Sequence, residues 1–226
     1  MTRLQALHQQ IVECRACPRL VAWREEVARV KVKRFRDWTY WGRPVPGFGD
    51  AKAKLLIVGL APAANGANRT GRMFTGDRSG DFLYAGLKRA GLASQAESVH
   101  RNDGLELYGV FITAPVRCAP PANKPLPQEL ENCRPWLDRE VALLPGVRVV
   151  LALGAIGWNA TLQHFERRGI ALPRPRPKFG HGAEARIGKN LTLLGCYHVS
   201  QQNTNTGKLT PAMFDAVLAR AKRLFT

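Results

Sequence analysis

The sequence has few acidic residues and no long apolar run. Only 17 residues are Asp or Glu, against 34 Lys and Arg, so the formal net charge is +17. No segment approaches the roughly 18 consecutive apolar residues of a transmembrane helix, and the first residues, MTRLQALHQQIVEC, lack the apolar core of a signal peptide. These absences argue against a membrane-spanning or secreted protein and predict a cytoplasmic one.

The excess of basic residues indicates a polyanionic partner. Lysines and arginines that neutralise phosphates release counterions, which gives an affinity that does not depend on base sequence. Nucleic acid therefore fits the excess best, and an anionic membrane surface is the competing interpretation. The run RVKVKRFR at 29–36 carries five basic residues and no acid. It is as consistent with a solvated edge as with a strip that follows phosphates.

Strand-like and helical runs alternate along a chain of ordinary globular composition, with 45% hydrophobic and 23% charged residues. The strand-like runs are at 54–60, 107–114, 147–153 and 190–197. Helical patterns occupy the first 30 or so residues, 79–90, 127–144, 154–168 and 211–225. Strands separated by helices form parallel sheets covered on both faces. We therefore predict one domain over 1–226, a three-layer α/β/α sandwich with a four-stranded parallel sheet.

A Gly-rich loop follows the first strand, where the ligands of such sheets bind. Its sequence, GLAPAANGANRTGRMFTGDRSG at 59–80, is typical of loops whose backbone amides hold phosphate. It lacks the Gly-Lys-Ser/Thr ending of a Walker loop and the GxGxxG pattern of dinucleotide sites. Asp77 lies beside the expected helix start, so a helix cap and a catalytic carboxylate are equally good interpretations. Phe74 fits either a site or the core.

The segment after the fourth strand, HVSQQNTNTG at 198–207, combines a histidine with amides and hydroxyls. A single His after a strand is more often structural than catalytic. His198, however, is expected at the same sheet edge as Asp77, which makes it a candidate for catalysis. The polar side chains that follow are suited to contact phosphates or to enter the space that an extruded base leaves.

Four of the five cysteines form a candidate metal site. Two residues separate Cys14 from Cys17, and 14 residues separate Cys118 from Cys133. A reducing compartment disfavours disulfides, so these thiols suit a structural zinc ion or a [4Fe–4S] cluster. Their spacing does not decide between these two sites, and four unrelated thiols are a third interpretation. Cys196 lies inside the fourth strand and is expected to be a small buried hydrophobic residue.

Three motifs resemble a known family. GLAPAANGANRTGRMFTGD after the first strand, RCAPPANKPLP after the second and YHVSQQNTNTG after the fourth are similar to the type B, or family 5, uracil-DNA glycosylases. The resemblance covers almost the whole chain. It implies the uracil-DNA glycosylase fold, a [4Fe–4S] cluster on the four cysteines, and repair of deaminated bases in double-stranded DNA. We expect a monomer that is associated with the nucleoid through DNA.

The resemblance also implies roles for individual residues. Asp77 is expected to stabilise positive charge on the sugar or to activate water, and His198 to donate to a base carbonyl as negative charge develops there. The expected contacts to the extruded base come from Gly59, Ala61, Ala63, Phe74, Ala114 and Asn123. The expected contacts to DNA come from Arg69, Arg72, Lys124, Ser200, Gln201, Gln202 and Asn203.

Ala114 separates this chain from uracil-specific relatives. Type A enzymes resemble it at ITAPVRCAPP but carry Asn in place of Ala114, and that amide would read the Watson–Crick edge of the base. Alanine cannot do so, and we expect a monofunctional glycosylase that also accepts hypoxanthine or xanthine. Asn65 stands where some members have His and is given no role. One alternative is a catalytically inert DNA-binding module of the same fold. Another is an enzyme for free nucleosides or nucleotides, but the excess of basic residues argues against it, because a small substrate does not need that charge.

Overall fold

The computed structural model describes residues 1–225, and four parallel strands form the middle of its sheet. They lie in the order β3 (Val110–Thr113), β2 (Leu55–Val58), β4 (Val149–Leu153) and β6 (Leu191–Cys196). β2, β3 and β4 are buried along their whole length. Such continuous apolar runs suit strands with helices on both faces, so the predicted α/β class and the four parallel strands are confirmed.

Two short antiparallel strands extend the sheet to six. β1 (Phe48–Gly49) pairs with β3 at one edge, and β5 (Glu184–Ile187) pairs with β6 at the other. The prediction of a four-stranded sheet was therefore incomplete. β1 has two residues inside a Gly- and Pro-rich loop, and β5 lies in a basic stretch between the third and fourth predicted strands. The alternation of exposed and buried residues in β5 was a usable signal for a strand with one covered face.

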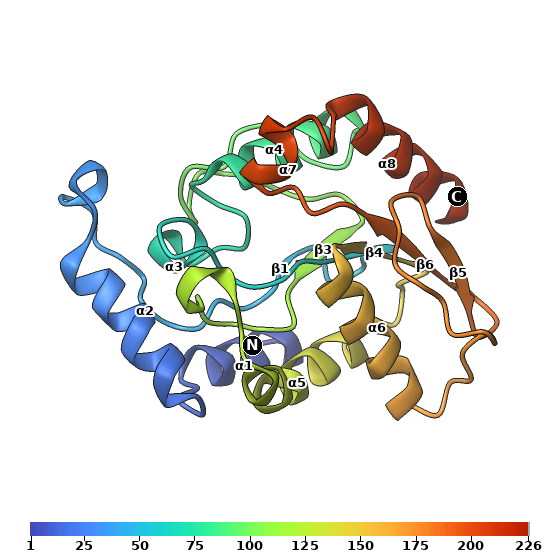
Figure 1. Ribbon diagram of the computed structural model, residues 1–226, viewed down its shortest axis with the longest axis horizontal. Helices are drawn as coiled ribbons and strands as arrows, with labels where there is room; N and C mark the ends of the chain where they lie inside the picture. Colours follow the sequence, from blue (N-terminus) through green and yellow to red (C-terminus); the bar gives the residue numbers. More distant parts are fainter. Residues whose placement is uncertain (226) are drawn as a thin grey trace.

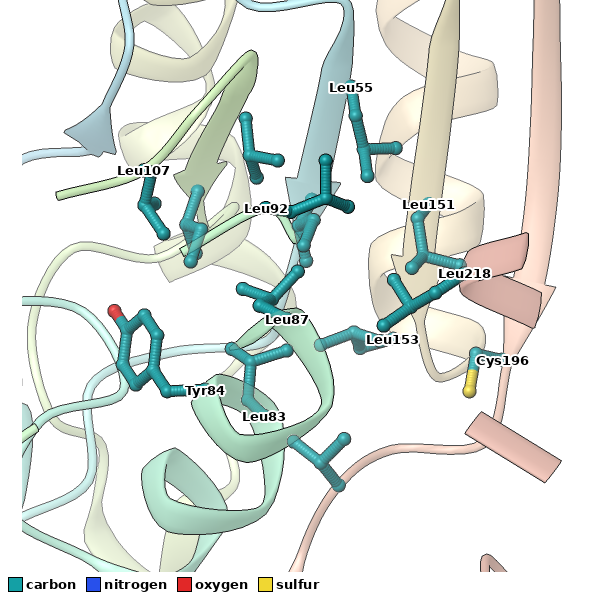
Figure 2. Close-up of a cluster of buried hydrophobic side chains, with 14 of the residues drawn as sticks. Leu55, Leu83, Tyr84, Leu87, Leu92, Leu107, Leu151, Leu153, Cys196 and Leu218 are labelled. Carbon is teal, nitrogen blue, oxygen red and sulfur yellow. The ribbon is translucent and has the colours of Figure 1, made fainter. Parts of the chain in front are cut away.

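Helices cover both faces of the sheet (Figure 1). α4 (Arg78–Arg89) and α8 (Pro211–Phe225) pack on one face, and α6 (Ala155–Arg167), α5 (Pro127–Ala142) and α1 (Arg3–Val12) lie on the other. Side chains alternate along each strand, so Leu55 and Leu151 meet Leu87 and Leu218 in the first core layer (Figure 2). None of the helices in residues 1–225 is long and apolar enough to cross a membrane.

Shorter elements lie around one end of the sheet. The N-terminal region continues from α1 into α2 (Pro18–Val30) and η1 (Lys33–Phe35). The loops after the strands contain α3 (Ala67–Thr70), η2 (Pro121–Asn123) and α7 (Gln201–Asn205). In Figure 1, α3 lies near the end of the sheet opposite to β5. The loops that contain these short helices, rather than the long helices, carry most of the residues that the sequence singles out.

A buried carboxylate ties the N-terminal region to the sheet. Glu140 on α5 is fully buried and accepts hydrogen bonds from Arg117 at 2.7 Å and Thr113 at 2.5 Å. The backbone N–H of Gly47 donates to it at 3.0 Å, and His8 Nε2 on α1 lies 3.2 Å away. One side chain therefore joins α1, α5, the loop before β1 and the end of β3.

We expect Glu140→Gln to destabilise the fold by about 3–5 kcal/mol, because it leaves the buried charge of Arg117 uncompensated. Burial alone would raise the pKa of Glu140, but Arg117 and the hydrogen-bond donors overcome this effect and lower it from 4.5 to about 2. The ionised form therefore stabilises the fold above the higher value, and this contribution is lost as the pH falls toward the lower one.

Urea unfolding of the wild type and the variant across this pH range measures the effect. The difference in unfolding free energy should be full at neutral pH and shrink below pH 4.5. Glu106→Gln, at an exposed loop position, is the matched control and should change little. A Glu140→Gln difference that stays constant down to pH 2 would contradict this account.

Candidate active site

A cavity of about 410 Å³ opens where β2, β3 and β6 end. Its wall is formed by the loops that follow these strands, as expected for a parallel sheet. The predicted residues that line it are Ala61, Ala63, Phe74, Asp77, Ala114, Asn123, Lys124, His198, Ser200 and Gln202. The structure therefore brings both candidate catalytic residues and most of the expected substrate contacts into one site.

Asp77 is a helix cap and a cavity residue at once. It is the N-cap of α4, and its Oδ1 accepts a hydrogen bond from the backbone N–H of Gly80 at 3.0 Å. Burial raises the pKa of Asp77, and the hydrogen bonds from Gly80 and Ser79 only partly oppose this rise. A carboxylate with a raised pKa is a stronger base, so the two interpretations of Asp77 are compatible.

Gly66 makes room for the second oxygen of Asp77. A Cβ atom built on Gly66 would lie 1.8 Å from Asp77 Oδ2, which is inside any permitted contact. The loop can therefore approach this carboxylate only with glycine at position 66.

His198 faces the same cavity as a neutral imidazole. It follows β6 directly, and burial lowers its pKa to about 4. Its carbonyl oxygen accepts a hydrogen bond from Asn203 Nδ2 at 2.8 Å, which fixes the backbone at this point. At neutral pH the ring therefore carries one N–H donor and no charge.

Phe74 stands beside His198 in a strained backbone conformation. Its φ is 51°, in the left-handed region that non-glycine residues avoid, and such strain is concentrated at functional sites. The centroid of its ring lies 6.2 Å from that of His198. Gly59 accommodates the ring, because a Cβ there would lie 2.9 Å from Phe74 Cζ. Gly59 thus supports the cavity from behind.

Two of the arginines predicted to contact DNA are buried in the protein instead. Arg72 is 4% exposed and pairs with Asp103 at 2.6 Å. Arg69 is 3% exposed and donates to the carbonyl oxygens of Asn65 at 2.8 Å and Gly76 at 2.7 Å. This geometry favours a role in holding the loop before Asp77 over a direct contact with phosphate.

The remaining predicted residues lie around the cavity without lining it. Gln201 is exposed at the start of α7, and Asn203 supports His198 from the same helix. The sequence missed other residues that line the cavity, namely Leu60, Pro62, Ala67, Met73, Ser79 and Ala122. Most are small or apolar, and nothing in their type separates them from core residues. Asn65, which received no role, accepts a hydrogen bond from Tyr40 at 2.9 Å.

The four predicted cysteine ligands line a second, smaller cavity between the N-terminal helices and α5. Donors point at three of the sulfurs: an Arg24 Nη lies 2.9 Å from Cys118 Sγ, the Arg117 backbone nitrogen lies 3.2 Å from Cys133 Sγ, and Asn132 Nδ2 lies 3.6 Å from Cys17 Sγ. Cys196 lies apart from them, fully buried in β6, which confirms the prediction that it belongs to the core.

Buried donors without acceptors surround this cysteine cavity. Arg24 Nε and Arg117 Nε and Nη1 have no hydrogen-bond partner in the described part of the chain. Burial raises the pKa of Cys118 to about 11 and that of Cys133 to about 12, so the free thiols would be neutral. Buried donors of this kind are costly unless they meet an acceptor, and metal-bound thiolates would supply the missing negative charge.

The ligand atoms of the cysteine cavity are not gathered around one point. Within residues 1–225, no three His, Cys, Asp or Glu side chains converge closely enough to hold one metal ion. In a four-iron cluster each thiolate binds a different iron, so the sulfurs stand farther apart than around zinc. The four cysteines around this cavity, three of which receive N–H groups at their sulfurs, are the residues that would hold such a cluster.

Comparison with known proteins agrees with this geometry. A family model described as the uracil DNA glycosylase superfamily matches residues 46–222. The chain belongs to this superfamily. The uracil-DNA glycosylase match covers the sheet and all the loops that line the cavity, so the family resemblance of the three motifs is confirmed.

Several curated uracil-DNA glycosylases are similar over nearly the whole chain. A type-5 uracil-DNA glycosylase of Thermus thermophilus is 56% identical over 97% of this chain and 97% of its own length. The type-5 enzyme of Mycobacterium tuberculosis is 56% identical over 96% of this chain and 80% of its own. A type-4 uracil-DNA glycosylase of Pyrobaculum aerophilum is 33% identical over 86% of this chain. Among uracil-DNA glycosylases the type-5 group is thus the more similar, as the motifs predicted.

Proposed function

We propose that the protein is a monofunctional DNA glycosylase that removes uracil, and also hypoxanthine or xanthine, from double-stranded DNA and leaves an abasic site. The observation that carries this proposal is the pairing of Asp77 and neutral His198 in one cavity at the ends of the parallel strands. A volume of about 410 Å³ is within the range of small-molecule sites. The curated relatives named type-5 uracil-DNA glycosylase support the removal of uracil.

The target base must leave the helix stack to reach this cavity. Extrusion costs a few kcal/mol and is cheapest at a mismatched or damaged pair, such as uracil opposite guanine. Phe74 stands at the cavity wall, where its ring is placed to stack on the extruded base. The backbone N–H groups of the loop after β2 are the candidate donors to the base carbonyls.

Hydrolysis breaks the bond between the sugar C1′ and the base nitrogen. The bonding electrons leave with the base, so positive charge develops on the sugar and negative charge on the base. Asp77 supports the sugar side, either by stabilising the positive charge or by taking a proton from the attacking water. His198 donates its N–H to a base carbonyl as negative charge builds there. A neutral His198 is suited to this task because it remains a donor without a charge in the ground state.

Ala114 sets the base range in this proposal. Its methyl group lines the cavity immediately after β3, and the residue is 1% exposed. An Asn amide at this position would reject bases that leave it unpaired, since unmet buried hydrogen bonds discriminate strongly. A methyl group imposes no such requirement, so several deaminated bases should be accepted.

The four cysteines are proposed to hold a [4Fe–4S] cluster. Cys14 and Cys17 lie at the junction of α1 and α2, Cys118 follows β3, and Cys133 is on α5. When bound, the cluster supplies a rigid link between these segments rather than a step of the reaction, because base hydrolysis transfers no electrons. Cys118 is four residues from Ala114, so the link also supports the floor of the active site.

End-labelled duplexes test the proposed activity. We expect the wild type to produce alkali-sensitive abasic sites both at uracil opposite guanine and at hypoxanthine opposite thymine. Cleavage at uracil alone would support the glycosylase proposal but refute the role given to Ala114. If protein that binds the duplex cleaves neither, the inert DNA-binding alternative is correct.

We expect Asp77→Asn to lower the single-turnover rate by roughly 10²–10⁴-fold, the usual range for a general base. Asparagine is also a good N-cap, so α4 should remain folded and duplex binding unchanged. Asp81→Asn, on the first turn of the same helix, is the matched control and should retain near-normal rates. If Asp77→Asn excises uracil as fast as this control, Asp77 is only a helix cap.

Cysteine substitutions test the cluster independently of activity. We expect Cys118→Ser to lose the visible absorbance of the purified protein and to lower its unfolding temperature, because one ligand is missing. Cys196→Ser, in the core of β6, should keep the absorbance and the iron content. Normal absorbance and iron content in Cys118→Ser would remove this residue from the ligand set.

A further inference from the structure

A second depression lies next to the active site and has a different character. It is a shallow groove of about 510 Å³ lined by Trp38, Tyr40, Trp41, Arg43, His100 and Arg101, among others, and we name it the aromatic-basic groove. The helix α3 separates it from the cavity: Ala67 lines the cavity, while Arg69 and Thr70 line the groove. The two sites are therefore neighbours across a single turn of helix.

The charge of the aromatic-basic groove is positive. Arg43 and Arg101 are exposed, and the lining residues in the described part of the chain include no Asp or Glu. Further cations continue from it, because Lys33, Arg34 and Arg36 are exposed on and beside η1. Asp37 next to Arg36 is the one acid of this segment. The basic run that the sequence left undecided thus lies beside a groove suited to anions.

Two residues of the basic run have partners within the protein, and a third acts on the helix that Asp77 caps. Arg29 pairs with Glu26, and the Lys31 ammonium donates to the Arg36 carbonyl oxygen. Burial raises the pKa of Asp81 on α4, and the positive charge of Arg34 opposes this rise. Positive charge beside the groove therefore also acts on the first turn of the helix that Asp77 caps.

Stacked arginines and aromatic rings build the wall of the groove. The Arg101 guanidinium lies 4.5 Å from the centroid of the Trp41 ring. The Arg69 guanidinium lies 4.1 Å from that of Trp38 and 3.8 Å from that of Phe35. Arg69 is also the residue that holds the carbonyl oxygens on both sides of α3. The groove is thus fixed rigidly to the loop that positions Asp77.

We propose that the aromatic-basic groove binds the sugar-phosphate backbone of DNA beside the extruded nucleotide, so that the strand runs from the cavity into the groove. This inference rests on the proposed function, because it takes duplex DNA to be the substrate. A cationic groove without acids, next to a base-sized cavity and lined by flat rings, matches what a nucleic-acid strand requires. It gives Arg43 and Arg101 a role in affinity and none in chemistry.

The double variant Arg43→Glu/Arg101→Glu tests this inference. Both side chains are exposed, so the fold should persist. On a uracil-containing duplex we expect at least tenfold weaker binding and a fall of about two in the slope of log affinity against log salt, one for each lost phosphate contact. The single-turnover rate at saturating enzyme should stay within about twofold of the wild type, since the cavity is unchanged.

Arg186→Glu/Lys189→Glu is the matched control, with the same charge change on and after β5 at the opposite end of the sheet (Figure 1). If both double variants weaken binding equally, the effect is general charge and the groove inference is wrong. Shortening the duplex on the flank that the groove covers should abolish the difference between the wild type and Arg43→Glu/Arg101→Glu. A difference that persists on duplexes shortened from either side would also overturn it.

These binding measurements separate the inference from the proposed function. If the wild type binds the duplex without excising any base, the glycosylase proposal is wrong. The groove inference is then still tested by whether Arg43→Glu/Arg101→Glu loses binding. An active wild type whose groove variant binds like the control contradicts the groove alone.

Discussion

The active-site cavity and the cysteine cavity both depend on the contacts of the buried Glu140 carboxylate. It fixes Thr113 at the end of β3 and Arg117 four residues later, so the segment between them is held at both ends. Ala114 of the cavity lies inside that segment, and the Arg117 backbone N–H points at Cys133. A single fully buried ion pair thus sets the floor of the active site and one wall of the cysteine cavity. The role of this ion pair is to fix one arrangement of the segments that it joins, because buried ion pairs contribute little net stability.

A second constraint acts on the loop between β2 and α4. The N–H groups at the start of α4 favour the ionised form of Asp77, whereas burial in the cavity raises the pKa of that carboxyl. Two residues of this loop accommodate the carboxylate. Glycine at position 66 leaves space for Asp77 Oδ2, and buried Arg69 holds the surrounding backbone through two carbonyl oxygens. The loop is therefore rigid in a region whose side chains are small, and this rigidity gives the carboxylate one orientation toward the cavity.

Local pattern predicts the frame of this protein and the place of its candidate site, because both follow from short-range rules. Continuous apolar runs identify β2, β3, β4 and β6, and parallel strands bring Asp77 and His198 to one edge. The short edge strand β1 and the burial of Arg69 and Arg72 arise from contacts distant in sequence, which periodicity does not contain. Glu140 is the clearest case: on sequence alone it is one more charged residue of an amphipathic helix, yet its partners come from three other segments of the chain.

The division between cavity and groove has an energetic reason. The cavity lining is mainly small and apolar, which suits a stacked base but offers little attraction for a polyanion. Extruding a base costs several kcal/mol, and that cost must be offset by contacts made elsewhere along the strand. Many of the acids are already paired with arginines, as in Glu129 with Arg19 and Asp103 with Arg72, so the basic surplus lies outside these pairs. Placing part of that surplus across α3 from the cavity lets contacts with the DNA backbone assist extrusion from outside the cavity.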